Sequence, residues 1–306
     1  MNILIIGGNG FIGSHLVDSL INRNHKVRVF DISHEKYRNP NPTVDYRISN
    51  LNSIPDLYEA MLGIDMIFHL ASASVPSTSN IDLINDVNNN LIPSLNILNL
   101  AVRQGIKKII YFSSGGAVYG NTDDIPITEN HQQNPISSYG IIKSTIEQYI
   151  KLFSKQYNID YLIIRPSNPY GPRQGHYNAQ GVISTFLKKA SNHESFTIYG
   201  DGNATKDYIY IDDLIEICNG LIASNVKGTY NVGSGVGMSL NEIIFIIDKV
   251  TKYKNIIVKT DPKDYDVKSF ILDMEKTKSK LQNPVNLTSL EEGIKLTWEW
   301  INTKDI

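Results

Sequence analysis

The sequence predicts an α/β fold in which a doubly wound parallel sheet is joined to a smaller, mixed α/β lid. Two observations carry this prediction. Short apolar segments alternate with helical patterns through the first half of the chain, as in parallel strands joined by right-handed helical crossovers. After residue 166 this alternation is lost, and prolines, glycines and tyrosines cluster between 166 and 181. A sheet of this kind binds its ligands at the carboxyl ends of the strands.

The expected elements follow the chain in order. In the first half we expect strands at 2–6, 26–31, 65–70, 108–112 and 160–165, and helices near 11–23, 54–62, 82–104 and 138–157. In the second half we expect strands at 196–199, 229–232 and 255–259, and helices at 181–190, 211–224 and 239–251. A last helix is predicted to begin with the capping box Thr288-Ser289-Leu290-Glu291. The predicted domains are a nucleotide-binding domain at 1–167, with a return segment near 205–232, and a second domain made of 168–204 and 233–306.

Composition indicates a soluble globular protein. The chain has 306 residues, of which 41% are hydrophobic and 20% charged, and its formal net charge is -2. We therefore expect neither nucleic acid nor a membrane as a partner. The single cysteine, Cys218, excludes an internal disulfide and a thiolate metal cluster, so no metal site is expected. No segment is long enough for a signal peptide or a transmembrane helix, which favours a cytoplasmic protein.

A glycine-rich turn follows the first predicted strand. Gly7, Gly10 and Gly13 have the spacing G-x-x-G-x-x-G, and the next segment has the apolar periodicity of a helix. The first glycine permits a tight turn, the second lets a pyrophosphate approach the backbone, and the third lets helix and strand pack closely. The pattern predicts a Rossmann-type dinucleotide site on the helix N-terminus. The alternative is a strand-turn-helix corner without a ligand.

Asp31 ends the second predicted strand, 18 residues after Gly13. An acid near this place in a Rossmann unit accepts hydrogen bonds from the adenosine ribose hydroxyls, and it would repel a 2′-phosphate. Asp31 therefore favours NAD over NADP. The alternative is a solvated acid at a strand end, or one that begins an Asx turn.

Tyr139 and Lys143 stand at positions i and i+4 of a predicted helix, after Ser113 and Ser114 at the end of the preceding strand. A lysine ammonium beside a phenol, and a positively charged nicotinamide nearby, lower the phenol pKa, so that the tyrosine becomes a usable general base toward an alcohol. Lys143 is also placed to hold the nicotinamide ribose. Alone, the pattern Y-x-x-x-K occurs often by chance; its place after a dinucleotide turn gives it meaning.

In this order the motifs resemble those of the extended short-chain dehydrogenase/reductases, within them the NAD-dependent sugar epimerase/dehydratase family, with UDP-glucose 4-epimerases giving the most similar pattern. The resemblance covers essentially the whole chain. Its motifs are 7–13, Asp31, 69–71, 113–120, Tyr139 with Lys143, 165–174, 200–202 and 207–213.

The resemblance implies roles for residues on the cofactor side. It implies a Rossmann domain that binds NAD, with Tyr139 as the base and Lys143 as its partner. The cofactor contacts it implies are Gly7, Gly10, Phe11, Ile12 and Gly13 for the pyrophosphate, Asp31 for the ribose, Asn50 and Leu51 for the adenine, and Leu70, Ala71, Ser72, Asn90, Lys143, Pro166 and Ser167 toward the nicotinamide. The family usually has Asp where this chain has Asn50.

For the substrate, the resemblance implies a nucleotide sugar. The residues it assigns are Ser74, Ser114, Asn168, Lys206, Lys263 and Phe270. Lys206 and Lys263 stand where the family usually has arginine on the diphosphate; lysine keeps the charge but loses the bidentate fork. A large residue such as Phe270 leaves no room for an N-acetyl group in this family and so favours glucose, galactose or 6-deoxy sugars. The alternative is that Phe270 is a core aromatic.

The serine-rich run departs from the family at Gly115, which stands where the catalytic Ser or Thr usually lies. Either Ser114 takes over this role, or Tyr139 works without a hydroxyl partner; we prefer Ser114. The alternative is that Ser113 and Ser114 only cap the strand end. Dehydratases of the family carry Asp-Glu after the catalytic Thr, and here those positions are Gly116 and Ala117, which argues against dehydration.

The leading hypothesis is therefore an isomerase, an NAD-dependent 4-epimerase of a nucleotide-activated hexose. The expected substrates are UDP-glucose and UDP-galactose, interconverted through a transient 4-keto sugar, in carbohydrate metabolism such as polysaccharide biosynthesis. The alternatives are a reductase of a dTDP- or GDP-linked 4-keto-6-deoxy sugar and a catalytically silent nucleotide-sensing homologue.

The family resemblance also implies a homodimer through the helices 82–104 and 138–157. Leu91, Leu95, Leu98 and Val102 form an apolar stripe suited to that interface. The alternative is that this stripe faces the protein's own sheet.

Overall fold

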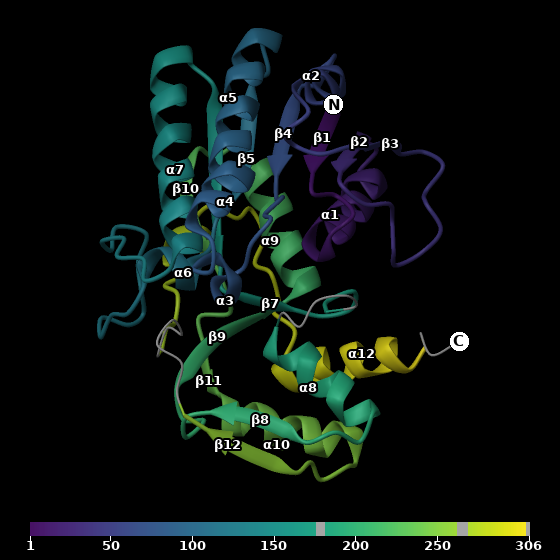
Figure 1. The fold of residues 1–306 in the computed structure, drawn as a ribbon, viewed down its shortest axis with the longest axis vertical. Helices are drawn as coiled ribbons and strands as arrows, with labels where there is room; N and C mark the ends of the chain where they lie inside the picture. The colour runs from purple at the N-terminus through teal and green to yellow at the C-terminus, as the bar shows by residue number, and fades with distance from the viewer. Residues whose placement is uncertain (176–180, 262–268, 304–306) are drawn as a thin grey trace. The chain divides into compact units, whose positions relative to one another are not determined.

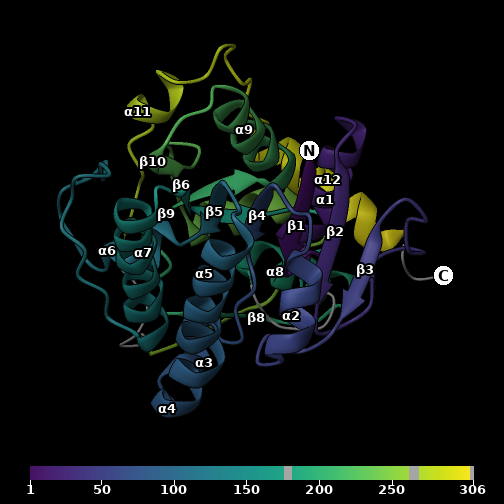
Figure 2. The ribbon, with the colours of Figure 1, turned by 90° about the horizontal axis from the view of Figure 1, so that it is seen from above.

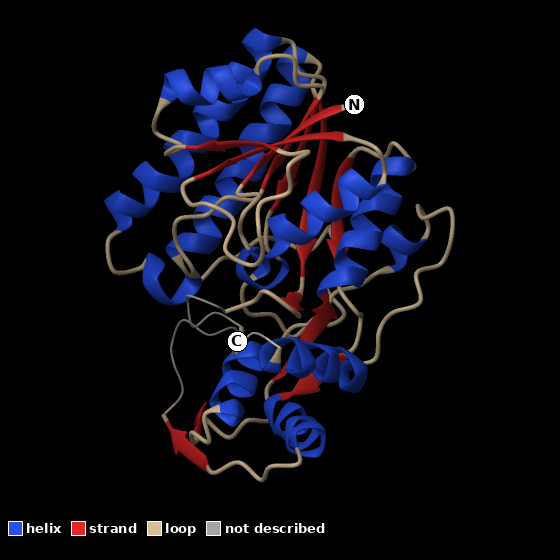
Figure 3. Cartoon of the chain, turned by 90° about the vertical axis from the view of Figure 1, so that its right-hand side faces the viewer, coloured by secondary structure: helices blue, strands red, loops and turns tan. Residues whose placement is uncertain are grey.

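The first strand, β1 (Asn2–Ile6), lies inside a seven-stranded sheet of order β10-β6-β5-β4-β1-β2-β3. Every pairing from β6 to β3 is parallel. Four of the five residues of β1 are buried, as expected for a parallel strand covered on both faces. Figures 1 and 3 show the strands of this sheet side by side. The computed structural model describes residues 1–175, 181–261 and 269–303.

The chain divides into two compact units. Unit 1 comprises Met1–Gly120, Gln132–Arg165 and Asn225–Tyr230, and unit 2 comprises Asn121–His131, Pro166–Ser224 and Asn231–Ile306.

The elements of the large sheet and its helices, in chain order, are β1, α1 (Phe11–Asn22), β2 (Lys26–Asp31), β3 (Asp45–Ile48), α2 (Ile54–Met61), β4 (Met66–His69), α3 (Pro76–Ser79), α4 (Leu83–Asp86), the π-helical turn η1 (Val87–Leu91), α5 (Ile92–Gln104), β5 (Lys108–Phe112), α6 (Gly115–Tyr119), α7 (Ser138–Tyr157), β6 (Asp160–Pro166) and β10 (Gly228–Val232). All five strands expected in the first half are present. The short strand β3 was not predicted from its sequence.

The helices α2, α5 and α7 pack on one face of this sheet. Their apolar residues share a buried cluster with alternate residues of β1, Leu4 and Ile6, and with residues of β4, β5 and β6. The view from above in Figure 2 shows α5 and α7 running side by side. The apolar stripe of α5 belongs to this core: Leu98 is buried in the cluster, and Leu91, Leu95 and Val102 pack against it. The stripe therefore packs, at least on one side, against the protein's own core, as the alternative expected, while Leu91, Leu95 and Val102 keep part of their surface exposed.

The helix expected at 82–104 is three segments, α4, η1 and α5. Pro93 lies in the first turn of α5 and has no N–H to donate to the preceding turn. The N–H of Ile92 instead donates to Val87 O, five residues earlier. The asparagines of η1 also have low helix propensity. The π turn lies next to the residues of the candidate site, as such turns often do.

The elements of unit 2 are β7 (Asn168–Tyr170), α8 (Val182–Ser191), β8 (Phe196–Tyr199), β9 (Thr205–Tyr210), α9 (Ile211–Ala223), β11 (Gly237–Ser239), α10 (Leu240–Thr251), β12 (Ile257–Thr260), α11 (Glu275–Lys278) and α12 (Leu290–Asn302). They form a three-stranded sheet, β11-β9-β7, and a two-stranded sheet, β12-β8. Cys218 is buried in α9, and this burial raises the pKa of its thiol well above the usual range.

The predicted cap of the last helix was wrong by one residue. Ser289, not Thr288, caps α12 by accepting a hydrogen bond from Glu292 N at 3.2 Å. Thr288 instead forms two hydrogen bonds with the Asp213 carboxylate: its backbone N–H donates at 2.8 Å and its hydroxyl at 3.0 Å.

Candidate active site

The turn between β1 and α1 requires glycine at two of its positions. Gly7 has φ +87°, and a Cβ there would lie 2.7 Å from Ala71 N. A Cβ on Gly13 would lie 2.1 Å from Gly7 O. No side chain caps α1, whose N-cap is Gly10, so the first amides of the helix, those of Phe11, Ile12 and Gly13, are left for an anion. The backbone present fits the pyrophosphate of a dinucleotide.

Asp31 holds this turn in place from the end of β2. Its Oδ2 accepts a hydrogen bond from Asn9 N at 2.9 Å, and its Oδ1 accepts one from Ser33 N at 3.1 Å. The second contact is an Asx turn, as one sequence alternative anticipated. A carboxylate has about four acceptor positions, so capacity remains for ribose hydroxyls. Asn50 and Leu51 follow β3, whose strand partner is β2; Asn50 is exposed, and Leu51 packs against the core.

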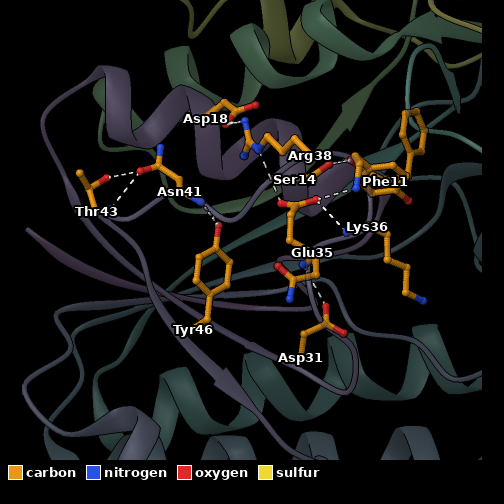
Figure 4. A network of polar contacts seen from close by, with 12 residues as sticks. Phe11, Ser14, Asp18, Asp31, Glu35, Lys36, Arg38, Asn41, Thr43 and Tyr46 are labelled. Carbon is orange, nitrogen blue, oxygen red and sulfur yellow. Dashed lines mark hydrogen bonds and ion pairs between the residues drawn. The ribbon is translucent and has the colours of Figure 1, made fainter. Parts of the chain in front are cut away.

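The loop after Asp31 contains an ion-pair cluster that sequence reasoning missed. Arg38 pairs with Asp18 of α1 and, at 3.7 Å, with Glu35, whose side chain is only 1% exposed. Figure 4 shows the side chains of Glu35 and Arg38 next to α1. Further along the same loop, Asn41 forms hydrogen bonds with Thr43 and Tyr46. The Glu35 carboxylate also accepts from Lys36 N and Tyr37 N. The cluster holds the loop against α1, beside the place where Asp31 would meet a ribose.

A small pocket in unit 1 brings together six of the residues singled out in the sequence. They are Ala71, Ser72, Ser74, Asn90, Tyr139 and Lys143. Tyr111 and Ser94 also line it and were not predicted. Apart from Lys108 at its start, β5 is apolar except for Tyr111. This polar group inside an apolar strand was a signal that could have pointed to Tyr111.

Tyr139 lies in the first turn of α7 and forms a side-chain hydrogen bond with Ser114. Part of its side chain is exposed, but burial around the hydroxyl raises the pKa of Tyr139 to about 12, and the bond to Ser114 acts in the opposite direction. The expectation that Lys143 lowers this pKa is therefore wrong for the protein alone. The cost of burying a phenolate exceeds the stabilisation by its polar neighbours.

Lys143 is 5% exposed and lies beneath the two tyrosines. Its Nζ is 4.9 Å from the centre of the Tyr111 ring and 5.6 Å from that of Tyr139, and it donates to Phe112 O at 2.9 Å. Burial lowers the pKa of Lys143 to about 8, and the charge of Glu147 opposes that shift. The ammonium is therefore still mostly protonated at neutral pH.

Ser114 is the N-cap of α6, and its Oγ accepts from Ala117 N at 3.3 Å. Because a hydroxyl has one hydrogen, this leaves the hydrogen of Ser114 for the oxygen of Tyr139. Gly115 is the first residue of α6 and offers no side chain. The Ser113 hydroxyl is buried and has no hydrogen-bond partner among the described residues. Ser114 thus does more than cap the strand end, whereas Ser113 makes no such contact.

His69 is a buried neighbour of this pocket. Ser94 Oγ donates to Asn90 O at 2.6 Å, so the 2.8 Å contact of His69 Nε2 with Ser94 Oγ has the histidine as donor. Burial lowers the pKa of His69 to about 3, with a smaller contribution from the charge of Lys143. The imidazole is therefore neutral and structural.

The residues assigned to the substrate by sequence lie in unit 2, apart from Ser74 and Ser114. Asn168 donates to Asp207 O at 2.9 Å, and Lys206 forms a β-bridge with Phe270. Phe270 is 3% exposed, as the core-aromatic alternative would have it. Pro166 is buried at the end of β6. Lys263 lies outside the described residues.

Over the described part of the chain, no helix is long and apolar enough to cross a membrane. In the same part, no group of three or more His, Cys, Asp or Glu residues could hold a metal ion.

Comparison with known proteins gives one family. The model of the NAD dependent epimerase/dehydratase family matches residues 3–233. A Methanocaldococcus jannaschii protein named "Putative UDP-glucose 4-epimerase" is 36% identical over 99% of each chain. A dTDP-4-dehydro-6-deoxyglucose reductase of Escherichia coli is 33% identical over 91% of each. The crystal structure of a Thermotoga maritima UDP-glucose 4-epimerase with UDP-glucose has a TM-score of 0.92 and 35% identity over 99% of each chain.

Proposed function

The chain belongs to the NAD-dependent epimerase/dehydratase family, and from this premise we propose that it is a nucleotide-sugar 4-epimerase. Its first candidate substrates are UDP-glucose and UDP-galactose, interconverted through a transient 4-keto sugar. The observation that carries the proposal is the pocket in which Tyr139, hydrogen-bonded to Ser114, lies above the Lys143 ammonium. The archaeal relative and the Thermotoga structure support the choice of reaction.

NAD is the cofactor of this family. The glycine turn and the uncapped start of α1 fit its pyrophosphate, and Asp31 fits its adenosine ribose. The remaining cofactor contacts that we propose are those given by the sequence: Asn50, Leu51, Leu70, Ala71, Ser72, Asn90, Lys143 and Pro166. When bound, NAD⁺ would supply the acceptor and donor of the C4 hydride, and its positive charge would favour the phenolate.

Tyr139 handles the proton. As the 4-hydroxyl becomes a carbonyl, its O–H bond breaks and the proton goes to Tyr139 Oη; it returns to the oxygen when the C4–H bond forms again. Ser114 donates its hydrogen to the phenolate that Tyr139 must present. The Lys143 ammonium, 5.6 Å from the centre of the Tyr139 ring, is proposed to favour the same phenolate once the cofactor is bound. Both effects are needed because burial alone opposes the phenolate.

The nucleotide sugar is proposed to bind through Ser74 and Ser114 of unit 1 and through Asn168, Lys206, Lys263 and Phe270. We further propose that the first unit serves the cofactor and the second the nucleotide. A single, buried cysteine fits a reducing compartment, so the cytoplasm is the proposed location, with a part in carbohydrate metabolism such as polysaccharide biosynthesis. Dehydration is not proposed, because Gly116 and Ala117 supply no carboxyl group.

The proposal is tested by incubating the purified protein with UDP-galactose and no added NADH, and following UDP-glucose by proton NMR. A panel of UDP-, dTDP- and GDP-hexoses, with UDP-N-acetylglucosamine as the test of Phe270, defines the substrate. The protein should convert at least one of these sugars to its C4 epimer without net consumption of cofactor.

The second candidate is a reductase of a nucleotide-linked 4-keto-6-deoxy sugar, favoured by the relative from Escherichia coli. This reaction uses the same Tyr and Lys but consumes reduced cofactor. Oxidation of NADH or NADPH on such a sugar, with no epimer formed from any hexose, would establish it in place of the first. A silent nucleotide-binding homologue would show neither activity, and Tyr139→Phe would leave its behaviour unchanged.

A homodimer through the helices 82–104 and 138–157 is also proposed. Because the stripe of α5 packs largely on its own core, the support comes from apolar residues exposed on these helices: Leu83, Ile84, Ile92, Ile141, Tyr149 and Leu152. Light scattering during gel filtration should give twice the chain mass of 34.4 kDa. Replacing Ile141 and Leu152 by aspartate should give the monomer.

A further inference from the structure

One buried acid in unit 1 has no part in the chemistry described above. Asp86, the last residue of α4, is 3% exposed. Its Oδ1 accepts hydrogen bonds from Ser74 Oγ at 2.6 Å and Asn90 Nδ2 at 2.7 Å, and its Oδ2 accepts one from Ser138 Oγ at 2.5 Å. Three side chains from three segments thus meet at one carboxylate.

The π turn η1 brings two members of this network together. Asn90 lies within η1, and its Nδ2 donates to Asp86 O at 3.1 Å as well as to the Asp86 carboxylate. Its Oδ1 accepts from Ala73 N at 2.7 Å. Both ends of the Asn90 amide are therefore committed, and the orientation of this pocket residue depends on Asp86.

The third contact reaches the helix of Tyr139. Ser138 is the first residue of α7; its N–H donates to Asn80 Oδ1 at 2.8 Å, and its hydroxyl donates to Asp86. Tyr139 is the next residue. The start of α7 is therefore held from the side by an asparagine and an aspartate that come from the same segment as Ser74 and Asn90.

We propose that Asp86 is a positioning residue, which sets the first turn of α7, and with it Tyr139, relative to Ser74 and Asn90 of the same pocket. The proposal rests on the proposed function. It has one consequence for recognition. Ser74 Oγ gives its hydrogen to Asp86 and accepts from Asn90 Nδ2 at 3.2 Å, so it keeps one acceptor position and would take a hydrogen bond from a sugar hydroxyl.

Filling space between helices would not require a carboxylate. A buried charge is costly unless it is paired or fully hydrogen-bonded, and apolar residues often replace buried polar networks without loss of stability. What an apolar residue cannot do is accept hydrogen bonds from three donors at once and so fix their mutual geometry. The choice of aspartate is explained by the geometry it imposes on pocket residues.

The test compares Asp86→Ala with Asp82→Ala. Asp82 caps the same helix, α4, by accepting from Asn85 N at 2.9 Å, but it is exposed and does not line the pocket. Steady-state kinetics with the epimerised sugar are measured well below the melting temperature of each variant. Hydrogen–deuterium exchange of the peptide that covers 138–142 provides a readout that does not depend on turnover.

We expect Asp86→Ala to lower kcat by at least about tenfold and to speed exchange at 138–142, while Asp82→Ala changes neither. Asp86→Asn should recover much of kcat, because its amide can accept from one hydroxyl and donate to another that turns around. Ser138→Ala, which breaks only the arm toward Tyr139, should lower kcat with little change in KM. If Asp86→Ala does not fold, the kcat values of Ser138→Ala and Asp86→Asn test the proposal in its place.

Wild-type kcat in Asp86→Ala, or slow exchange at 138–142 equal to that of the wild type, would overturn the proposal. So would a loss in Asp82→Ala as large as that in Asp86→Ala, since both would then report only the stability of α4. If the wild-type protein converts no sugar of the panel, the proposed function fails, and exchange alone decides whether Asp86 positions α7.

Discussion

Ser114 forms a hydrogen bond with Tyr139 from the N-cap of α6, one residue before Gly115. The hydroxyl thus reaches the phenol from outside the helix. A cap residue can do this because it has extended backbone geometry, here φ -154° and ψ 129°, and is not yet part of the helix. This relationship gives the first prediction.

Replacing Ser114 by alanine should lower kcat by about 10²- to 10³-fold, the range found when a positioned proton-transfer or hydrogen-bonding group is removed. The affinity for NAD should stay within about twofold, because Ser114 touches the phenol and not the cofactor turn. The loss of the cap should also cost about 1 kcal/mol of stability. Kinetics, NAD titration and thermal melting measure the three effects.

Ser113→Ala is the matched control, since the Ser113 hydroxyl is buried in the same strand end and makes no hydrogen bond among the described residues. It should leave kcat near the wild-type value. Equal losses in the two variants would show that the strand end, and not the Ser114 hydroxyl, matters.

Features that depend on local backbone geometry could be read from the sequence. Gly7 and Gly13 are needed wherever a strand turns this sharply into a helix, so their spacing predicts the turn, and Asp31 follows from the length of one βαβ unit. Tyr139 and Lys143 could be paired because four residues make one helical turn. The family motifs extended this to most of the candidate site.

Features that depend on distant partners could not be read. Asp86 acquires its meaning from Ser138, 52 residues later, and nothing in the Asn-rich stretch around it indicates a π turn. The stripe Leu91, Leu95, Leu98 and Val102 is equally suited to a dimer or to a core, and only the packing decides. The pKa of Tyr139 likewise depends on burial, which periodicity does not measure.

The glycine turn predicts a difference between fold and cofactor. Gly10 has φ -79°, and a Cβ there meets only Gly7 O, at 3.4 Å, an ordinary contact. Gly10→Ala should therefore fold with a melting temperature close to that of the wild type. Since this glycine is where the pyrophosphate would approach the backbone, affinity for NAD should fall by about tenfold or more. Calorimetric titration with NAD⁺ measures it.

Gly13→Ala is the contrasting variant. Its Cβ would lie 2.1 Å from Gly7 O, a backbone atom that cannot move without opening the turn. It should melt well below the wild type. The free energy of unfolding should fall by the roughly 1–3 kcal/mol typical of overpacking, or by more. If Gly10→Ala binds NAD⁺ as the wild type does, the cofactor does not lie on this turn.

His69 predicts a pH dependence of stability. Burial lowers its pKa from 6.5 to about 3. Between these two pH values the unfolded chain binds a proton at His69 and the native protein does not. The contribution of neutral His69 is present above pH 6.5 and is lost as the pH falls toward 3. Between pH 6.5 and 5 the loss should approach about 2 kcal/mol, at 1.36 kcal/mol per pH unit. Urea unfolding at several pH values measures it.

His69→Gln keeps an N–H for Ser94 and removes the titration. The difference in unfolding free energy between wild type and variant should change with pH over this interval, and this comparison cancels the other histidines, including the less buried His25, whose pKa is also lowered. A difference that stays constant from pH 7 to 5 would show that His69 has the same pKa in the native and unfolded states, and that burial does not lower it.

Glu147 and Arg165 form a buried ion pair behind the pocket and give the last prediction. The side chains are 0% and 3% exposed. Arg165 donates to both carboxylate oxygens, at 2.9 and 2.6 Å, and to Tyr119 Oη at 2.7 Å, while Gln133 donates to Glu147 at 2.7 Å.

Removing one partner of this pair leaves an uncompensated buried charge. Arg165→Met and Glu147→Gln should each lower the unfolding free energy by about 3–5 kcal/mol. The double variant should lose less than the sum of the two, because neither charge remains. Denaturant unfolding of the four proteins completes this cycle, and strict additivity would mean that the pair contributes nothing as a pair.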